Sequence, residues 1–359
     1  MVVGAGFFGA TAAHLLARAG QRVLLIDRRE HLAGNAHSPV VEGARRHEYG
    51  AHIFHTDNEQ IWRFVNRFAD FNGYRHKVYT KTSYGIFSLP LNMLTFQKLW
   101  GAETPQDAER MLAMTRESFA DPQNMEEYCL QTFGRQIYEL FIRDYTCKQW
   151  GRAPHTLPVS IARRIPLRMT YNNDYFADRY QGIPKGGYTE LIACMLDEEN
   201  ITVRLGESWN AQWQQYAKRL IYSGPLDQLF DCKYGPLPYR SLRFHHRKVS
   251  QNQQGAAVLN HPEFGQDFTR TIEHCHFHPE ETLRQGWYTW ETPAACNEEN
   301  PEPYYPVPGR ETSHRRMQYI KLAHKQQREI LVGGRLGQYR YMDMHQVIAE
   351  AWAKVGSWA

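Results

Sequence analysis

The chain has 359 residues, of which 42% are hydrophobic and 22% are charged, a balance typical of a globular enzyme. This length predicts two or three domains and excludes a disordered chain, because a chain of this size buries a large core. The net charge is only +4, and no run of five or more Lys and Arg occurs. These features argue against a nucleic-acid-binding tail and fit an anionic small-molecule substrate.

Six cysteines are scattered along the chain without a CxxC pair. This scatter indicates reduced thiols and predicts a cytoplasmic protein rather than a disulfide framework. No secretory segment opens the sequence, and no apolar stretch approaches the ~18 residues that a membrane span requires. We therefore expect no membrane span.

The first 27 residues predict a strand, a glycine turn, a helix and a second strand. Gly4, Gly6 and Gly9 have the GxGxxG spacing, which allows a tight turn, close approach of a pyrophosphate and close packing of helix on strand. Asp27 ends the second strand, where an acid binds ribose hydroxyls. Only Met1 to Val3 precede Gly4, which is short for a first strand, as if a residue or two had been lost or a different start assigned. The pattern predicts dinucleotide binding.

Further along the chain, hydrophobic periodicity predicts a mixture of helices and strands. Phe141 and Tyr145 are expected to share one helix face, because they lie four residues apart. The expected elements are an amphipathic helix at 58–71, mostly helix at 104–146, strands at 201–205 and 217–223, alternating strands over 239–292, and a strand, glycine loop and helix over 330–351.

Two groups of histidines invite a metal interpretation. His52 and His55 form an H-x-x-H pair, and His274, His276 and His278 would face one way on a strand. No further ligands at suitable spacing accompany either group, so we expect no metal and interpret the second group as sheet surface.

Six motifs in a fixed order now define a resemblance. They are H-L-A-G-N at 31–35, E-Y-G-A-H-I-F-H-T at 48–56, D-Y-T-C-K-Q-W-G at 144–151, F-T-R-T-I-E-H at 268–274, P-Y-Y-P at 303–306 and G-R-L-G-Q-Y-R-Y-M-D-M at 334–344. Together they resemble the bacterial UDP-galactopyranose mutases. The similarity extends from residue 1 to about 352, nearly the whole chain.

The resemblance implies an α/β fold with a discontinuous Rossmann-like FAD-binding domain, a helical insert over the substrate and a mostly antiparallel β-sheet domain beneath the flavin. The site is expected in the cleft among them, roofed by a mobile loop near 150–165. The implied ranges are 1–68, 185–224 and 328–359 for the FAD-binding domain, 92–150 for the helical domain, and 69–91, 151–184 and 225–327 for the sheet domain.

The implied cofactor is FAD, active when reduced. Arg335 would lie beside the flavin, Gly34 and Asn35 would close over the pyrophosphate, and the His52 loop would pass close to the flavin. The implied cofactor-binding residues are Gly4, Gly6, Phe8, Gly9, Asp27, Arg28, Gly34, Asn35, His52, Arg335, Asp343 and Met344.

The implied substrate is a UDP-sugar, whose diphosphate suits the planar fork of arginine. By resemblance, Arg164 and Arg270 grip this diphosphate, and they count with His52 as catalytic. The remaining implied substrate contacts, which include an aromatic wall for uracil, are Phe141, Tyr145, Thr146, Trp150, Tyr175, Phe176, Asn260, Tyr304 and Tyr341.

The implied reaction is the interconversion of UDP-galactopyranose and UDP-galactofuranose, an isomerisation without net redox change. In the family, N5 of reduced flavin attacks C1 of the sugar and displaces UDP, so that a flavin N5–C1 sugar adduct holds the sugar while the ring opens and O4 closes onto C1. The resemblance implies no nucleic-acid partner. Family members often form homodimers, but no interface is recognisable in the sequence.

Three alternatives stay open. One is an FAD-dependent redox enzyme, similar to an amine oxidase or a desaturase, which shares the dinucleotide motif but does not need Arg164 and Arg270. The second is a non-catalytic UDP-sugar-binding relative. The third is a mutase for a modified hexose or a deoxythymidine nucleotide, which Phe268, where the family commonly has Tyr, and the unusual segment 278–292 leave open.

Overall fold

The computed structural model describes residues 1–250, 252–279, 285–325, 330–356 and 358. The chain divides into two compact units. Unit 1 comprises Met1–Tyr74, Asp178–Tyr239 and Pro303–Ala359, and unit 2 comprises Arg75–Ala177 and Arg240–Glu302. The division into three domains at the expected boundaries stays a prediction.

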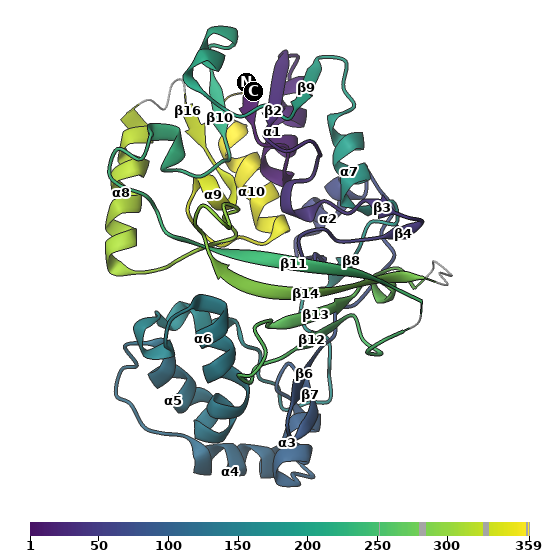
Figure 1. Cartoon of the computed structure of the whole chain (residues 1–359), viewed down its shortest axis with the longest axis vertical. Coiled ribbons are helices and arrows are strands. Elements are labelled where there is room, and N and C mark those ends of the chain that lie inside the picture. Colours follow the sequence, from purple (N-terminus) through teal and green to yellow (C-terminus); the bar gives the residue numbers. More distant parts are fainter. Residues whose placement is uncertain (251, 280–284, 326–329, 357, 359) are drawn as a thin grey trace. The chain divides into compact units, whose positions relative to one another are not determined.

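Unit 1 is built on a five-stranded parallel sheet with strand order β16-β10-β1-β2-β9. The chain adds strands on one side of β1 and then on the other, so the direction of winding changes between β1 and β10. Figure 1 shows this sheet with α1 and α10 packed next to it. The strands are β1 (Val2–Val3), β2 (Val23–Asp27), β9 (Ile201–Leu205), β10 (Leu220–Tyr222) and β16 (Ile330–Val332).

The glycine turn after β1 is as tight as the sequence predicts. Gly4 has φ +105°, a conformation that favours glycine. A Cβ atom on Gly9 would lie 1.8 Å from the carbonyl oxygen of Gly4, so only glycine allows the first turn of α1 (Phe7–Arg18) to pack on β1. Most of α1 is buried, which explains its alanine-rich, apolar sequence.

The predicted helix 58–71 is shorter in the structure. Helix α2 (Glu59–Val65) ends because Asn66 caps it, with the Asn66 Nδ2 donating to the carbonyl oxygen of Trp62 at 2.7 Å. The chain then tightens into a turn in which the Phe68 N–H donates to the carbonyl oxygen of Val65. Phe68 still packs inward, with its ring 5.0 Å from that of His14.

The other elements of unit 1 are short strands and helices around the sheet. They are η1 (Gly34–Ala36), β3 (Val40–Val41), β4 (Ala44–Arg45), β5 (Phe54–Thr56), β8 (Tyr180–Gly182), α7 (Gly187–Leu196), η5 (Ala211–Tyr216), η6 (Gln228–Phe230), β15 (Tyr305–Pro306), α8 (Arg310–Lys325), α9 (Gly334–Gly337) and α10 (Met344–Val355). Here η1, η5 and η6 are 3-10 helices.

Unit 2 contains a mostly antiparallel sheet in which the strands β11-β14-β13-β12-β6-β7 lie side by side. Only the β12–β6 pair is parallel among these described strands. The strands are β6 (Val78–Thr82), β7 (Gly85–Leu89), β11 (Tyr239–Val249), β12 (Val258–Asn260), β13 (Arg270–Glu273) and β14 (Gly286–Ala295).

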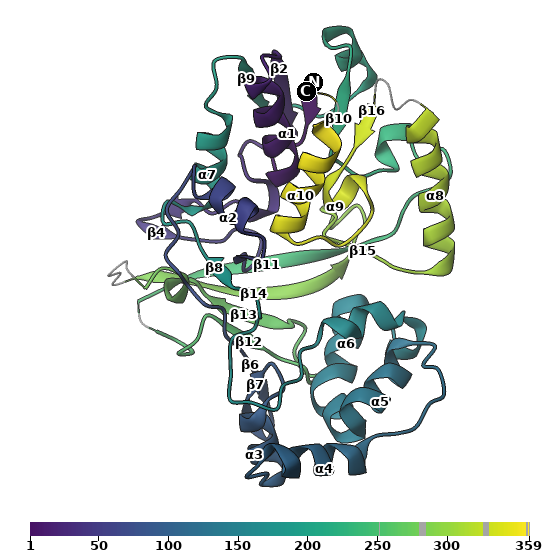
Figure 2. The same ribbon diagram turned by 180° about the vertical axis from the view of Figure 1, so that it is seen from behind.

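The helical part of unit 2 has its own hydrophobic core, which includes Phe96, Phe133 and Ile137. Figure 2 shows α5 and α6 side by side in this part. Thr104 and Asp107 start α4 with a capping box, and Pro105 occupies its first turn. The helices are α3 (Met93–Trp100), α4 (Pro105–Thr115), α5 (Met125–Ile137), a π-helix (Tyr138–Arg143), α6 (Asp144–Trp150), and the 3-10 helices η3 (Pro154–Thr156) and η4 (Val159–Arg164). The mobility expected near 150–165 stays a prediction.

The interpretation of His274, His276 and His278 as one strand face is wrong. Residues His274–Phe277 form a 3-10 helix, η7, after β13 ends at Glu273. His274 and His278 are buried rather than on the sheet surface. Histidines at every second residue suggested a strand, but a pattern this short also occurs in a 3-10 turn. Part of the unusual segment 278–292, residues 280–284, lies outside the described residues.

The predicted fold class is confirmed: a discontinuous Rossmann-like α/β part, a helical insert and a mostly antiparallel sheet. Within the described ranges, none of the helices combines the length and the apolar character needed to cross a bilayer.

We expect Gly9→Ala to lower the free energy of unfolding by roughly 1–3 kcal/mol, because its Cβ must displace the backbone beneath it. Chemical denaturation without added dinucleotide measures this loss. Gly6→Ala is the matched control from the same motif, because the atom nearest to its Cβ would be 4.0 Å away. Equal stability of the two variants would contradict the packing argument.

Candidate functional site

Unit 1 contains a cavity of about 310 Å³ at the carboxyl ends of its parallel strands. Its lining includes Gly4 after β1, Asp27 at the end of β2, Ser223 after β10 and Gly334 after β16. This is the edge where the winding direction changes between β1 and β10, the place where open α/β sheets bind ligands.

Ten of the twelve predicted cofactor-binding residues line this cavity. The exceptions are Gly9 and Asp343. Gly9 packs against the carbonyl oxygen of Gly4 in the glycine turn. Asp343 precedes α10 and donates its N–H to Gln346 Oε1 at 3.0 Å. The lining residues are Gly4, Gly6, Phe8, Asp27, Arg28, Gly34, Asn35, His52, Arg335 and Met344.

Two glycine backbones form the part of the cavity suited to phosphate. Gly6 is the N-cap of α1, and a Cβ on Gly34 would lie 3.3 Å from the Gly6 Cα. The first N–H groups of α1 and its dipole favour an anion at this point. Asn35 is held beside it by a 2.9 Å hydrogen bond from Arg29 Nη1 to Asn35 Oδ1.

Asp27 is fixed by the backbone around it. Its Oδ2 accepts the Ala5 N–H at 2.6 Å and its Oδ1 accepts the Arg29 N–H at 2.9 Å. A carboxylate has about four lone-pair positions, so acceptor capacity is left for ribose hydroxyls. Asp27 therefore stands where the motif predicts it, in an orientation set by the glycine turn.

Among the lining residues that the sequence analysis did not select are Glu207, Ser208 and Trp209. They follow β9, and the ring of Trp209 lies 6.4 Å from that of Tyr222 in an edge-on arrangement. The signal was available, because 201–205 was predicted as a strand and the residues after a parallel strand lie at the same edge as Asp27.

His52 is held in one tautomer beside the cavity. Its Nδ1 lies 2.9 Å from the carbonyl oxygen of Gly50, which can only accept, so Nδ1 carries the proton and Nε2 is an acceptor. Burial, with a smaller contribution from the nearby Arg335, lowers the pKa of His52 to about 4, against the opposing effect of the Gly50 hydrogen bond. The imidazole is therefore neutral at neutral pH.

Two predicted substrate residues, Tyr304 and Tyr341, also belong to unit 1. The guanidinium of Arg335 lies 4.4 Å from the ring centre of Tyr341, and Tyr305 stacks on Tyr341 at 6.0 Å. Tyr304 is buried, with its ring 6.4 Å from that of Tyr49. The structure thus brings a predicted phosphate-binding tyrosine against a predicted flavin-binding arginine.

In unit 2, strand register places Asn260, Arg270 and Glu291 in one row across the sheet. Asn260 is the cross-strand partner of Arg270, and Arg270 is the partner of Glu291, so the three side chains share a face. Arg270 Nη1 lies 3.3 Å from Glu291 Oε1. Asn260 Oδ1 is buried and accepts no hydrogen bond from the described part of the chain.

Glu291 was not predicted from the sequence. It is only 1% exposed. Burial raises its pKa, and the neighbouring Arg270 opposes that shift. The pairing fixes the guanidinium fork in one direction. Since Glu291 lies 21 residues from Arg270 on another strand, only the sheet register reveals this role.

The predicted uracil wall lies on the π-helix and α6. Phe141 is buried, with its ring 5.1 Å from that of Phe87, and Thr146 is buried. Burial raises the pKa of Tyr145, while Arg270 lowers it, so this hydroxyl is close to the arginine. A π-helix is uncommon and often marks a functional site, and the hydrophobic periodicity did not predict it.

Four further predicted residues lie elsewhere in unit 2. Trp150 ends α6 and packs against the helical core, and Arg164 is exposed at the end of η4. The rings of Tyr175 and Phe176 meet edge-on at 5.1 Å, and His76 stacks on Phe176 at 5.8 Å. The expected pairing of Arg164 with Arg270 on one diphosphate stays a prediction.

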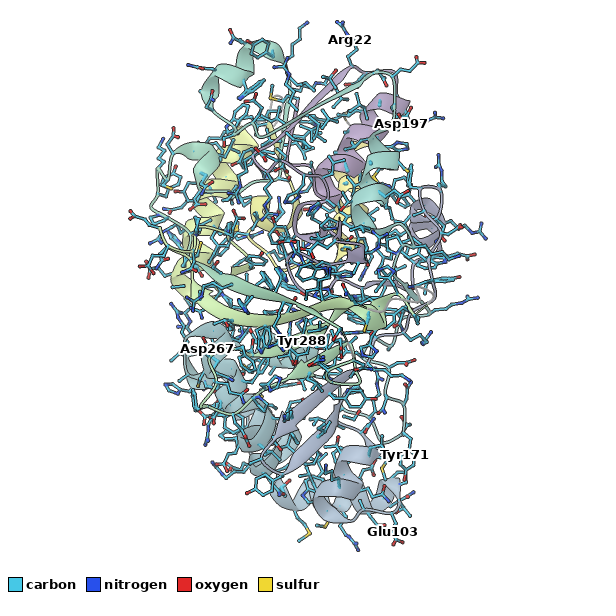
Figure 3. The ribbon with its side chains drawn as sticks, turned by 45° about the vertical axis from the view of Figure 1, so that its right-hand side comes forward. Arg22, Glu103, Tyr171, Asp197, Asp267 and Tyr288 are labelled. Atoms are coloured by element: carbon cyan, nitrogen blue, oxygen red, sulfur yellow. The ribbon has the colours of Figure 1, made fainter. Side chains whose placement is uncertain are left out.

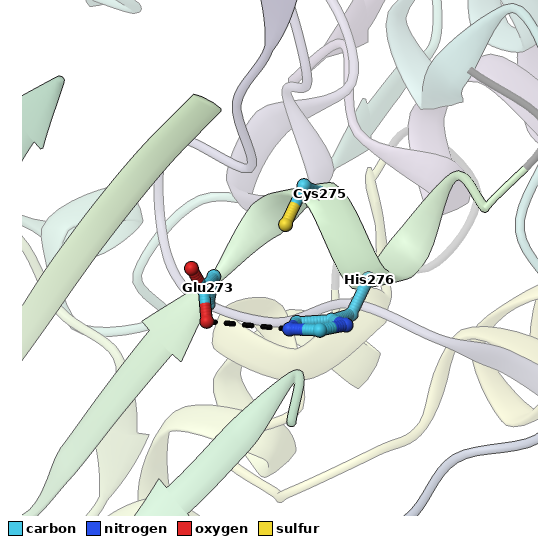
Figure 4. A group of neighbouring side chains, drawn as sticks. All are labelled: Glu273, Cys275 and His276. Carbon is cyan, nitrogen blue, oxygen red and sulfur yellow. Dashed lines mark hydrogen bonds and ion pairs between the residues drawn. The ribbon is translucent and has the colours of Figure 1, made fainter. Parts of the chain in front are cut away.

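The structure brings Glu273 and Cys275 beside His276, although we expected no accompanying carboxylate or cysteine. Among the described residues, these three form the one group whose possible metal-ligand atoms lie within 4.8 Å of one another (Figure 4). However, Glu273 Oε1 accepts the Gln253 N–H at 2.6 Å, and its Oε2 accepts the Gln254 N–H at 3.0 Å. The carboxylate therefore clamps a backbone segment, and we keep the prediction that no metal binds.

Two histidines of unit 1 make stability depend on pH. Burial lowers the pKa of His37 and of His52 from 6.5 to about 4 each. Between these values the unfolded chain binds more protons than the folded chain, so the free energy of unfolding falls as the pH falls from about 6.5 towards 4. We expect His37→Gln to weaken this dependence in thermal unfolding between pH 7 and pH 5.

The control for this measurement is His155→Gln, which replaces an exposed histidine and should keep the wild-type dependence. The same slope of melting temperature against pH in His37→Gln and wild type would contradict the assignment.

Comparisons with known proteins agree with this geometry. A family model described as UDP-galactopyranose mutase matches residues 140–341, and one described as an NAD(P)-binding Rossmann-like domain matches residues 2–68. The chain is 38% identical over 356 residues to a probable UDP-galactopyranose mutase of Klebsiella pneumoniae, covering 98% of this chain and 92% of that protein. It is 35% identical over 363 residues to a dTDP-fucopyranose mutase of Escherichia coli, covering 98% and 96%.

The fold is similar to the crystal structure of a reduced UDP-galactopyranose mutase, with a TM-score of 0.76 at 16% identity, covering 99% of this chain and 94% of that one. This likeness supports the fold, while the family model and the relatives carry the assignment. The chain belongs to the UDP-galactopyranose mutase family, a family of isomerases.

Proposed function

We propose that this protein interconverts UDP-galactopyranose and UDP-galactofuranose with reduced FAD as its cofactor. The observation that carries the proposal is the row of Asn260, Arg270 and Glu291, in which a buried carboxylate fixes an arginine fork beside Tyr145. A fixed guanidinium suits a diphosphate, because it bonds two oxygens at once. The amide oxygen of Asn260, which accepts no hydrogen bond from the described residues, leaves room for a donor from the ligand.

The residues of unit 1 fit FAD. The cavity combines a helix N-terminus and two close glycine backbones for the pyrophosphate with Asp27 for the ribose. Arg335, Met344 and His52 would then meet the flavin end. When bound and reduced, a flavin supplies a nucleophilic nitrogen for the anomeric carbon of the sugar.

The side chains of the protein would bind UDP when it leaves the sugar. Departure of UDP leaves negative charge on the diphosphate, which Arg164 and Arg270 would stabilise. The same contacts keep UDP near the sugar, so that its return does not depend on diffusion. The hydroxyls of Tyr175, Tyr304 and Tyr341 would bond the same phosphates.

The nucleotide base would stack on the aromatic wall of Phe141 and Tyr145. Such stacking contributes ~1–3 kcal/mol per base. Thr146, Trp150 and Phe176 would complete the contacts to nucleotide and sugar. The neutral His52, with Nε2 as an acceptor, would accept a hydrogen bond at the flavin rather than contribute charge.

A second candidate is a mutase for a deoxythymidine nucleotide or a deoxy sugar. It is favoured by the 35% identity to a protein named dTDP-fucopyranose mutase. A stacking wall distinguishes uracil from thymine weakly, because it tolerates a methyl group. Competition between UDP and dTDP for the protein separates the two candidates. Cytoplasmic localisation and formation of a homodimer stay predictions.

The direct test is conversion by the purified protein. Its visible spectrum should show bound flavin, and after reduction with dithionite it should convert UDP-galactofuranose to UDP-galactopyranose, followed by chromatography. The unreduced protein is the control and should be inactive. UDP binding without conversion would favour the second candidate. Bound flavin without UDP binding would overturn the site and favour a redox flavoenzyme.

We expect Arg270→Lys and Arg164→Ala each to weaken UDP binding about 10- to 100-fold, because a charged hydrogen bond is worth about 1.5–3 kcal/mol. Lysine at 270 keeps a cation beside buried Glu291 but removes the fork. Titration calorimetry measures the affinity, and the flavin spectrum should be unchanged. The exposed neighbour provides the control Arg163→Ala, which should bind UDP as wild type does. Wild-type affinity in both test variants would remove the arginines from the site.

A further inference from the structure

One loop of unit 2, residues His261–Phe268, joins Asn260 to the segment that carries Arg270. We call it the 261–268 loop. The backbone closes it at its base, where the His261 N–H donates to the carbonyl oxygen of Thr269 at 2.8 Å. Its middle part is exposed and includes Asp267 (Figure 3). The loop therefore connects two residues of the predicted substrate site without core packing along most of its length.

The ammonium of Lys148, on α6, lies inside this loop. Its Nζ is within hydrogen-bond distance of four backbone carbonyl oxygens, so α6 and the loop share one polar centre. The four distances are 2.7 Å to His261 O, 2.9 Å to Glu263 O, 3.3 Å to Gln266 O and 3.0 Å to Phe268 O.

Further hydrogen bonds hold the same helix end. Thr269 Oγ1 donates to Gln149 Oε1 at 3.1 Å, and Arg240 Nε, on β11, donates to the carbonyl oxygen of Gln149 at 3.0 Å. These contacts fix where the end of α6 meets the sheet. Tyr145 lies one turn earlier on α6, so the position of its ring is tied to the same junction.

The geometry suits lysine in particular. An ammonium is a compact charge with three donors that can be shared among converging acceptors. A guanidinium is planar and spreads its donors, so it cannot bring one nitrogen close to four oxygens. A neutral side chain would leave several carbonyl dipoles without a partner unless the loop opened to water.

We propose that Lys148 is a positioning residue that holds the 261–268 loop closed and so sets the spacing between Tyr145 on α6 and the Asn260–Arg270 pair on the sheet. The inference rests on the proposed function, because it assigns that spacing to nucleotide binding. It adds a residue that the motif analysis did not select, although it lies inside the D-Y-T-C-K-Q-W-G motif. Lys148 itself does not need to touch the substrate.

The test compares Lys148→Met with Lys148→Arg in the full-length holoprotein. Both variants should bind UDP about 10- to 100-fold more weakly than wild type, since misplacement by about 1 Å can cost 100-fold. The KM for the nucleotide-sugar should rise in parallel, with a smaller change in kcat. Flavin content should be unchanged, because unit 1 holds the predicted flavin residues.

The matched control is Lys98→Met, also in unit 2. Its ammonium donates to the single carbonyl oxygen of Ile86 at 2.8 Å and is exposed. This variant should keep wild-type UDP affinity and KM.

The outcomes separate positioning from general stability and from failure of the proposed function. If Lys148 only stabilised unit 2, fewer molecules would be active, kcat would fall, and KM and UDP affinity would stay as in wild type. Wild-type affinity in Lys148→Met, or full recovery in Lys148→Arg, would overturn the proposal. Failure of the wild-type protein to bind UDP would instead overturn the proposed function.

Discussion

In the proposed function, negative charge on a diphosphate is the constraint that both units of this chain address. Unit 1 offers neutral backbone N–H groups at a helix start, where two glycines allow a close approach. Unit 2 offers a guanidinium that a buried carboxylate orients. The two solutions suit different tasks. A bound cofactor needs a permanent site, whereas a diphosphate that leaves and returns needs an arginine held in one direction, which keeps it near the sugar.

The sheets provide the rigidity that these sites require. In unit 1 the parallel strands end at one edge, so residues from five separate segments meet around one cavity. In unit 2 the cross-strand register aligns Asn260, Arg270 and Glu291, although they lie on three different strands. The hydrogen bonds of the Lys148 ammonium likewise fix a helix and a loop against each other.

The sequence predicted what depends on local chemistry. The glycine turn, the position of Asp27 at a strand end and the strand, glycine loop and helix within 330–351 all follow from short motifs. Most predicted cofactor residues line the cavity for the same reason. Their roles, like those of the substrate residues, await measurement.

The sequence could not predict what depends on contacts between distant segments. Lys148 meets carbonyl oxygens 113 to 120 residues away, which no pattern in one strand or helix reveals. A short alternation was also misinterpreted: His274 to His278 suggested a strand, but His274–Phe277 form a 3-10 helix. Trp209 could have been found from its place after β9, whereas Glu291 required the register of β13 and β14.

The central claim is that UDP departs from the sugar and returns to it during an isomerisation. The most direct measurement uses UDP-galactopyranose labelled with ¹⁸O between C1 and the β-phosphorus, incubated with the dithionite-reduced protein. If UDP departs and is held in place, the label should move into the non-bridging β-phosphate positions of recovered substrate, as seen by ³¹P NMR. Conversion to UDP-galactofuranose with the label still fully bridging after many turnovers would contradict the claim, because the β-phosphate of a departed UDP exchanges its oxygens by rotation before it returns.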